Sequence, residues 1–272
     1  MSAPVLDGID YEASGIGPTI VLVPGSCSTG AAWRPVIAHW GGRFRCVTTS
    51  LLGYGGTVER RTAVDPDISH EAEVVESVIR RAGGPVHLVG HSFGGLVAVA
   101  IALRRHVPVA SLVILEAPAV TLLSAVDEPR HCEDFRIMSD HYFRAHSRGE
   151  AEAIATMIDF YGGAGTFASW PERVRAYAVR TTPVNIMDWQ SAYGFALTPA
   201  VLGEIDIPVI VVVGSDSHPA ARRANELLAA AIARSSFSSI PGAAHFMIAT
   251  HAQDVARVVG EHIAGVVGRM RR

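Results

Sequence analysis

The pentapeptide Gly90-His91-Ser92-Phe93-Gly94 constrains the fold of this chain more than any other segment of its 272 residues. The apolar run 85–89 before it is typical of a short buried strand, and the Ala-, Val- and Leu-rich run 96–103 after it indicates a buried helix. So tight a turn strains the backbone of its central residue, and glycine on either side keeps Cβ atoms away from the strand and the helix. The pattern therefore predicts a nucleophile elbow, a strand–turn–helix unit that holds Ser92 at the positive end of a helix.

A serine hydroxyl needs a base to accept its proton, and His245 is the base that the sequence favours. Residues 236–240 have the pattern of a late strand, and the loop 241–244 leads directly to His245, so this histidine can reach over the sheet edge toward Ser92. The chain has 12 histidines, so the others must be weighed. Three of them lie in or beside helical patterns and one belongs to the turn, which it is expected to shape: His39, His106, His262 and His91.

The chain resembles the α/β-hydrolase fold family over nearly its whole length. Before the elbow, residues 18–23 have the pattern of a buried strand that runs into Pro24-Gly25-Ser26-Cys27-Ser28 and then Trp33. This succession resembles the family's strand, His-Gly turn and tryptophan, except that Pro24 stands in place of the usual histidine.

Later segments extend the resemblance. Residues 51–57 resemble the family's D-x-x-G-x-G-x-S loop, with Leu52 close to the position of the usual aspartate. Strand-like runs at 109–115 and 208–213 then precede the loop of His245. The order serine, acid, histidine is the order of the family.

The acid that would orient His245 has two candidates. The resemblance implies an acid three residues beyond the glycine that ends the later strand, but counting from Gly214 gives Ser217, and Asp216 lies one position early. The family's other place for this acid, found in haloalkane-dehalogenase-like relatives, is the end of the preceding strand, where Glu116 stands. Either carboxylate could fix the tautomer of His245. The sequence favours Glu116 and keeps Asp216 as the alternative.

Acyl transfer also needs two backbone amides aimed at the developing oxyanion. One should come from Phe93, directly after the nucleophile, and the other from Ser26, which follows the Pro-Gly turn. No His-Gly-Gly-Gly run is present, so the lipase-like form of this loop is not expected. Cys27, next to Ser26, has no elbow or base loop of its own, and we expect it to be a small buried residue.

Composition limits the classes of partner and the compartment. Hydrophobic residues make up 49% of the chain and charged residues 18%, and the net charge is −3, which predicts a compact protein without a nucleic-acid partner. Three cysteines lie far apart without metal-type spacing, which fits a reducing compartment. We expect no metal or cofactor, because attack by an activated serine requires neither and the sequence has no cluster of ligand residues. No signal-peptide pattern and no apolar run of about 20 residues is visible, so we expect a cytoplasmic protein without a membrane span. The oligomeric state stays open.

Alternating strand-like and helix-like segments predict an α/β fold, a mostly parallel sheet with helices on both faces. The alternation stops between residues 119 and 202. The resemblance implies a helical cap there, inserted into a hydrolase core made of residues 1–118 and 203–272. A minority of the bulky side chains of the cap should face Ser92 and shape the substrate pocket. The candidates are Phe135, Tyr142, Phe143, Met157, Phe160, Tyr161, Trp170, Tyr177, Trp189, Tyr193 and Phe195.

Together these features predict a serine hydrolase that cleaves small carboxylic esters through an acyl-enzyme. Serine at the elbow argues against dehalogenase or epoxide-hydrolase chemistry, for which the resemblance implies an aspartate at this position. Three alternatives stay open. They are a C–C bond hydrolase, an acyltransferase or perhydrolase that uses the same residues, and a non-catalytic member of the fold that binds a small ligand.

Overall fold

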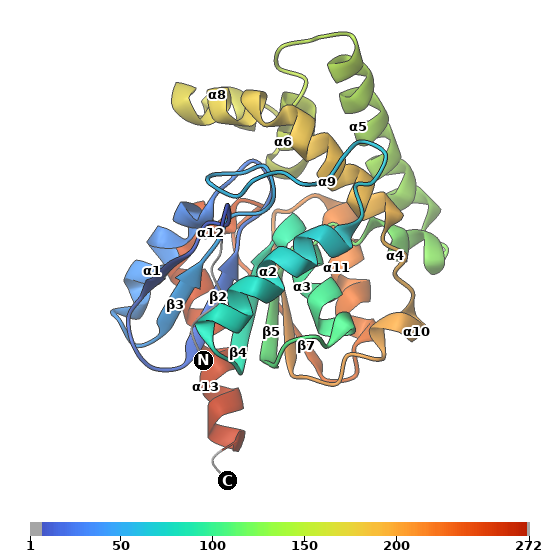
Figure 1. The fold of residues 1–272 in the computed structure, drawn as a ribbon. Helices are drawn as coiled ribbons and strands as arrows, with labels where there is room; N and C mark the ends of the chain where they lie inside the picture. The colour runs from blue at the N-terminus through green and yellow to red at the C-terminus, as the bar shows by residue number, and fades with distance from the viewer. Residues whose placement is uncertain (1–6, 271–272) are drawn as a thin grey trace.

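A computed structural model describes residues 7–270 and contains one seven-stranded sheet with the strand order β1-β3-β2-β4-β5-β6-β7 (Figure 1). Strand β1 pairs antiparallel with β3, and every other neighbouring pair of strands is parallel. The prediction of a mostly parallel α/β sheet is therefore confirmed. The strands are β1 (Glu12–Ser14), β2 (Thr19–Val23), β3 (Arg45–Thr48), β4 (Val86–His91), β5 (Val109–Leu115), β6 (Val209–Gly214) and β7 (Ser235–Ile240).

Helices cover both faces of the sheet because the central strands are apolar on both sides. In β2, Val21 and Val23 belong to one buried cluster, and Ile20 and Leu22 belong to a second cluster on the opposite face. The first cluster contains α2 (Ile68–Ala82), α3 (Phe93–Arg104) and α11 (Pro219–Ala231). The second contains the 3-10 helix η1 (Gly30–Trp33), α1 (Arg34–Trp40), α12 (Met247–Thr250) and α13 (Ala252–Met270).

The segment between β5 and β6 is helical and contains no strand, as expected for residues 119–202. In Figure 1, α5, α6, α8 and α9 lie above the sheet, at the top of the view. We call residues 119–202 the cap segment; its standing as a unit separate from the core stays a prediction. Its helices are α4 (Val120–Ala125), α5 (Pro129–Ser147), α6 (Ala155–Gly162), α7 (Thr166–Ser169), α8 (Glu172–Arg180), α9 (Thr182–Gly194) and α10 (Pro199–Leu202).

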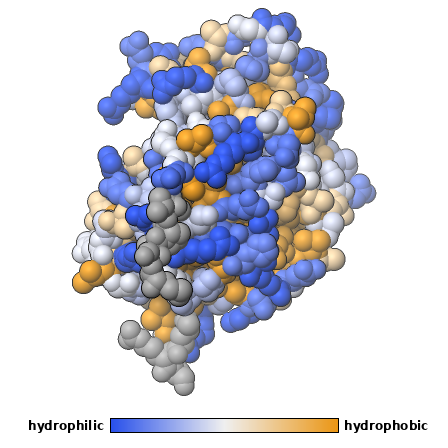
Figure 2. Space-filling view, in the orientation of Figure 1, coloured by the Kyte–Doolittle hydropathy of each residue, from blue (hydrophilic) through white to orange (hydrophobic). Residues whose placement is uncertain are grey.

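The surface is polar over most of the face seen in Figure 2, and its apolar residues are scattered in small groups. Large exposed hydrophobic side chains are few among the described residues and lie far apart in the sequence, as Ile16, Val64 and Phe237 illustrate. Over residues 7–270, no helix combines the length and the hydropathy that crossing a bilayer requires. The apolar side chains are thus gathered mainly in the two clusters beside the sheet.

Candidate active site

Ser92 lies in the turn between β4 and α3, with φ +54° and ψ −128°. The tight turn around this strained residue is possible because glycines stand two positions before and after it. A Cβ on Gly90 would lie 2.3 Å from the carbonyl oxygen of Gly94, and a Cβ on Gly94 would lie 2.3 Å from that of Pro24. The Ser92 amide donates to the carbonyl of Leu115 at 2.8 Å, which fixes the turn to β5. The two glycines of the pentapeptide therefore permit the tight turn because they have no side chains.

A chain of hydrogen bonds joins Ser92, His245 and Glu116. Nε2 of His245 lies 2.9 Å from Oγ of Ser92, and Nδ1 of the same ring lies 2.8 Å from Oε2 of Glu116. A carboxylate only accepts hydrogen bonds, so the imidazole carries its proton on Nδ1 and offers a lone pair at Nε2 to the serine hydroxyl. The three residues follow β4, β5 and β7, and parallel strands bring their carboxyl ends to one edge of the sheet.

Glu116 is almost completely buried and has φ +49°. Burial alone would raise the pKa of this carboxyl, but hydrogen bonds from His245, Ser217 and the Gly214 amide outweigh it and keep the pKa below its usual range. The Gly214 amide donates to Oε1 at 2.8 Å, and the Ser217 hydroxyl donates to the same oxygen. Glu116 is therefore held as a carboxylate beside His245.

Asp216, the alternative acid, lies apart from this chain of hydrogen bonds. Its side chain is exposed and accepts a hydrogen bond from the Ser215 hydroxyl at 2.8 Å. Ser217 stands where the resemblance implies the family's commoner acid. Its hydroxyl donates a hydrogen bond to Glu116. The structure thus brings Glu116, and not Asp216, into contact with His245.

His91 and Tyr161 fix the position of His245. Nε2 of His91 donates to the backbone carbonyl of His245 at 2.8 Å. Burial and the neighbouring His245 lower the pKa of His91 to about 3, so its ring stays neutral. The ring of Tyr161, on α6, stacks on the ring of His245, with 4.0 Å between their centroids and 25° between their planes. His91 thus holds the loop of His245 in place.

The two expected oxyanion donors, Phe93 and Ser26, both line the cavity beside Ser92. The turn of Ser26 lies against the nucleophile, since a Cβ on Gly25 would come within 2.8 Å of the Ser92 Cβ. Cys27 follows in a left-handed conformation, with φ +56°. Burial raises the pKa of the Cys27 thiol to about 12, which leaves it uncharged and a poor nucleophile.

A buried polar cluster beside this turn was not foreseen from the sequence. Asp188, on α9, accepts hydrogen bonds from the hydroxyls of Ser26 (2.5 Å) and Tyr54 (2.6 Å) and from Nη1 of Arg61 (2.8 Å). Arg61 also lies 3.2 Å from the buried carboxyl of Glu71, whose pKa is raised to about 8 by burial. Asp188 and Arg61 are 127 positions apart, so no local pattern could have paired them.

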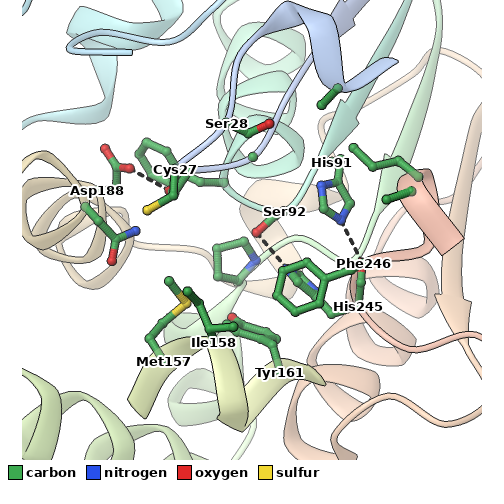
Figure 3. Close-up of a pocket in the computed structure, with 18 of the residues that line it drawn as sticks. Cys27, Ser28, His91, Ser92, Met157, Ile158, Tyr161, Asp188, His245 and Phe246 are labelled. Carbon is green, nitrogen blue, oxygen red and sulfur yellow. Dashed lines mark hydrogen bonds between the residues drawn. The ribbon is translucent and has the colours of Figure 1, made fainter. Parts of the chain in front are cut away.

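A cavity of about 350 Å³ opens in front of Ser92 and His245 (Figure 3). Figure 3 shows Met157, Ile158 and Tyr161 together along one wall, with Cys27 and Asp188 on another side. The predicted minority of cap side chains does line the cavity: Met157, Tyr161, Trp170 and Trp189. Within residues 7–270, no three His, Cys, Asp or Glu side chains gather in a way that could hold a metal ion.

Known proteins that resemble this chain include curated proteins of similar sequence and solved structures of similar fold. Among curated proteins, the pimeloyl-[acyl-carrier protein] methyl ester esterase of Vibrio vulnificus is 29% identical over 157 residues, which are 53% of this chain and 59% of that protein. Haloalkane dehalogenase 2 of Mycobacterium tuberculosis is 32% identical over 98 residues, 36% of this chain and 34% of that protein. The aligned segments span 34% to 59% of the lengths of the curated relatives.

A thermophilic esterase from Thermogutta terrifontis has the same fold, with a TM-score of 0.73 and 22% identity over 95% of this chain and 93% of that one. The model of the family described as "Alpha/beta hydrolase family" matches residues 20–258. This match runs from the second strand of the sheet into the last helix, and it shows that the chain belongs to the alpha/beta hydrolase family.

Proposed function

We propose that this protein is a serine hydrolase that cleaves small carboxylic esters through an acyl-enzyme intermediate. The observation that carries the proposal is the hydrogen-bonded chain from Glu116 through His245 to Ser92. Ser92 and His245 line a largely apolar cavity. A neutral imidazole between a serine hydroxyl and a carboxylate is the arrangement that activates a serine for attack on a carbonyl.

In the proposed reaction, Oγ of Ser92 attacks the ester carbonyl while Nε2 of His245 takes the serine proton. Glu116 stays a carboxylate, holds the Nδ1 proton and stabilises the imidazolium that forms. The backbone amides of Phe93 and Ser26 would bind the oxyanion. His245 then gives its proton to the leaving alcohol, the alcohol departs, and a water activated by the same histidine releases the acid and frees Ser92.

The relatives support this reaction class more than its competitors. Two of the proteins described above are named as esterases. The match to a haloalkane dehalogenase does not extend to its chemistry, because that reaction needs a carboxylate nucleophile and residue 92 is a serine. A small-molecule ester partner and a cytoplasmic location are part of the same proposal.

Hydrolysis of 4-nitrophenyl acetate and butyrate by the wild type and by Ser92→Ala tests the proposal. Turnover that disappears in the variant supports a serine esterase. Binding of these esters without turnover would instead favour a ligand-binding member of the fold. Faster product formation in the presence of a competing alcohol or peroxide would favour acyl transfer.

Longer acyl chains should be better substrates up to the capacity of the cavity. Met157, Ile158 and Trp189 offer apolar surface, and each buried methylene contributes up to about 0.8 kcal/mol, roughly fourfold in kcat/KM. We therefore expect kcat/KM to rise from 4-nitrophenyl acetate to hexanoate. A series that stays flat over these chain lengths would contradict an apolar acyl site.

The hydroxyl of Ser26 should matter for the rate because Asp188 holds it at 2.5 Å and thereby fixes the turn that carries the proposed amide donor. We expect Ser26→Ala to lower kcat roughly tenfold with little change in KM, less than the ~100-fold or greater loss typical of removing an oxyanion donor. Ser26→Thr keeps a hydroxyl and is the matched control. If Ser26→Ala raised KM and left kcat unchanged, the hydroxyl would serve substrate binding instead.

A further inference from the structure

Tyr161 presents a hydrogen-bond donor that nothing in the described structure satisfies. Its side chain is 3% exposed and lines the cavity, yet its hydroxyl oxygen has no hydrogen-bond partner among the described residues. Burial raises the pKa of this hydroxyl well above its usual range, so it stays a neutral donor. Figure 3 shows Tyr161 beside Met157 and Ile158, on the wall that faces Ser92 and His245.

Asn185, on α9, presents a second donor to the same cavity. Its side chain is 1% exposed, and the Tyr142 hydroxyl donates to its Oδ1 at 3.0 Å. That bond leaves the two N–H groups of the amide, for which the described part of the chain provides no acceptor. Both unpaired donors therefore belong to cap helices and border the cavity.

Unpaired donors in a buried site are unfavourable, and native proteins rarely keep them without a use. Asp188, the carboxylate nearest in sequence to Asn185, is already bound by Ser26, Tyr54 and Arg61. A bound molecule with an acceptor oxygen can therefore pair with Tyr161 and Asn185. A pocket with placed donors also selects against analogues that lack the matching acceptor, because such analogues leave the donors unpaired.

We propose that Tyr161 and Asn185 form a polar subsite that binds an acceptor oxygen of the substrate other than the oxygens of the scissile ester. The substrate class is then an ester whose acyl or alcohol part carries an ether, keto or hydroxyl oxygen, rather than a simple alkyl ester. This inference rests on the proposed esterase function and narrows its substrate. The remaining cavity wall accepts the hydrocarbon parts of the same molecule.

The test moves one oxygen through a substrate of constant length. The acyl series consists of 4-nitrophenyl hexanoate and its isosteres propoxyacetate, 3-ethoxypropanoate and 4-methoxybutanoate. The alcohol series compares pentyl butanoate with its isosteres 2-ethoxyethyl and 3-methoxypropyl butanoate, and the release of butanoic acid is measured. Each kcat/KM is divided by the rate of hydroxide hydrolysis of that ester, which removes differences in intrinsic reactivity. We expect at least one oxygen-containing ester to exceed its hydrocarbon counterpart.

The variants Tyr161→Phe and Asn185→Leu should reduce this preference by about threefold to tenfold, the range for one lost hydrogen bond. The matched control is Tyr193→Phe, because Tyr193 also lies on a cap helix but its hydroxyl binds Ser139 at 2.9 Å and it does not line the cavity. The preference should be unchanged in this control. Tyr161→Phe should also keep the melting temperature of the wild type, since its hydroxyl has no protein partner to lose.

A binding experiment separates failure of the subsite from failure of the esterase proposal. N-Methylamides of hexanoic acid and of the three ether acids resist hydrolysis, and their affinities for Ser92→Ala protein are measured by calorimetry. Tighter binding of an ether amide, lost in Ser92→Ala/Tyr161→Phe, supports the subsite even if no ester is hydrolysed. Ester hydrolysis with no oxygen preference in rates or affinities would overturn the subsite and leave the esterase proposal standing. Absence of both binding and hydrolysis would overturn both.

Discussion

Replacing Ser92 by alanine should lower ester turnover by at least about a thousandfold, the scale of loss when a member of a serine triad is removed. The reason is that, among the described residues, the Ser92 hydroxyl is the only group that donates a hydrogen bond to Nε2 of His245. The measurement is kcat for 4-nitrophenyl butyrate on purified protein. Alanine fits the turn without a new contact, so the fold should persist.

Ser147→Ala is the control for this substitution, because Ser147 is exposed at the end of α5 and bonds only within its own helix. Its activity should equal that of the wild type. Circular dichroism and melting temperature establish that Ser92→Ala is folded. A folded Ser92→Ala protein that kept most of its turnover would show that Ser92 is not the nucleophile.

Replacing Glu116 by glutamine should lower kcat by up to about ten-thousandfold, as is typical for loss of a triad carboxylate. A glutamine can present its NH₂ to Nδ1 of His245, which favours the tautomer whose proton sits on Nε2 and faces Ser92. The imidazolium would also lose its neighbouring negative charge. The measurement is kcat at neutral pH for the same ester.

Asp216→Asn is the matched control, since Asp216 is exposed and bonds to Ser215 rather than to His245. Its kcat should stay within a few-fold of the wild type. A steep loss in Asp216→Asn with a mild loss in Glu116→Gln would reverse the assignment of the acid. Equal partial losses in both variants would contradict a single orienting carboxylate.

The elbow and most strands of the sheet could be predicted because local sequence determines them, whereas β3 was not among the predicted strands. The strand expected at 208–213 is β6 (Val209–Gly214), and the helix expected from 96 begins three residues earlier, directly after Ser92. Continuous apolar runs identify strands that are buried on both faces, and this signal needs no knowledge of the partners. The resemblance to the α/β-hydrolase fold, drawn from these motifs, is confirmed by the family match.

The acid and its supports could not be decided in this way. Glu116 and Asp216 both lie just after strands, and only the folded structure shows that the Glu116 side chain turns toward His245. Ser217 stands where the family's pattern has an acid, and the sequence gives it no role. In the structure its hydroxyl donates to Glu116. A strand-end serine gives no local signal of such a role.

The cap segment was the least predictable part. Its helical character followed from the missing strands, but the pairing of Asp188 with Ser26, Tyr54 and Arg61 joins residues 127 to 162 positions apart. Which aromatic side chains face the cavity also depends on how α6 and α9 are turned over the sheet. Amphipathic pattern alone could not show this, because every cap aromatic has a plausible place in the core.

Covalent labelling with an alkyl fluorophosphonate, read by intact mass and by peptide mapping, tests the central claim most directly. Oγ of a serine that a neighbouring base has activated attacks the phosphorus of this reagent and displaces fluoride, and the phosphonyl group then stays bound to that oxygen. We expect one equivalent on the wild type, located on Ser92, no adduct on Ser92→Ala, and much slower labelling of Glu116→Gln. An adduct on another residue, or an unlabelled protein that still hydrolyses esters, would contradict the assignment of Ser92, His245 and Glu116 as the catalytic residues.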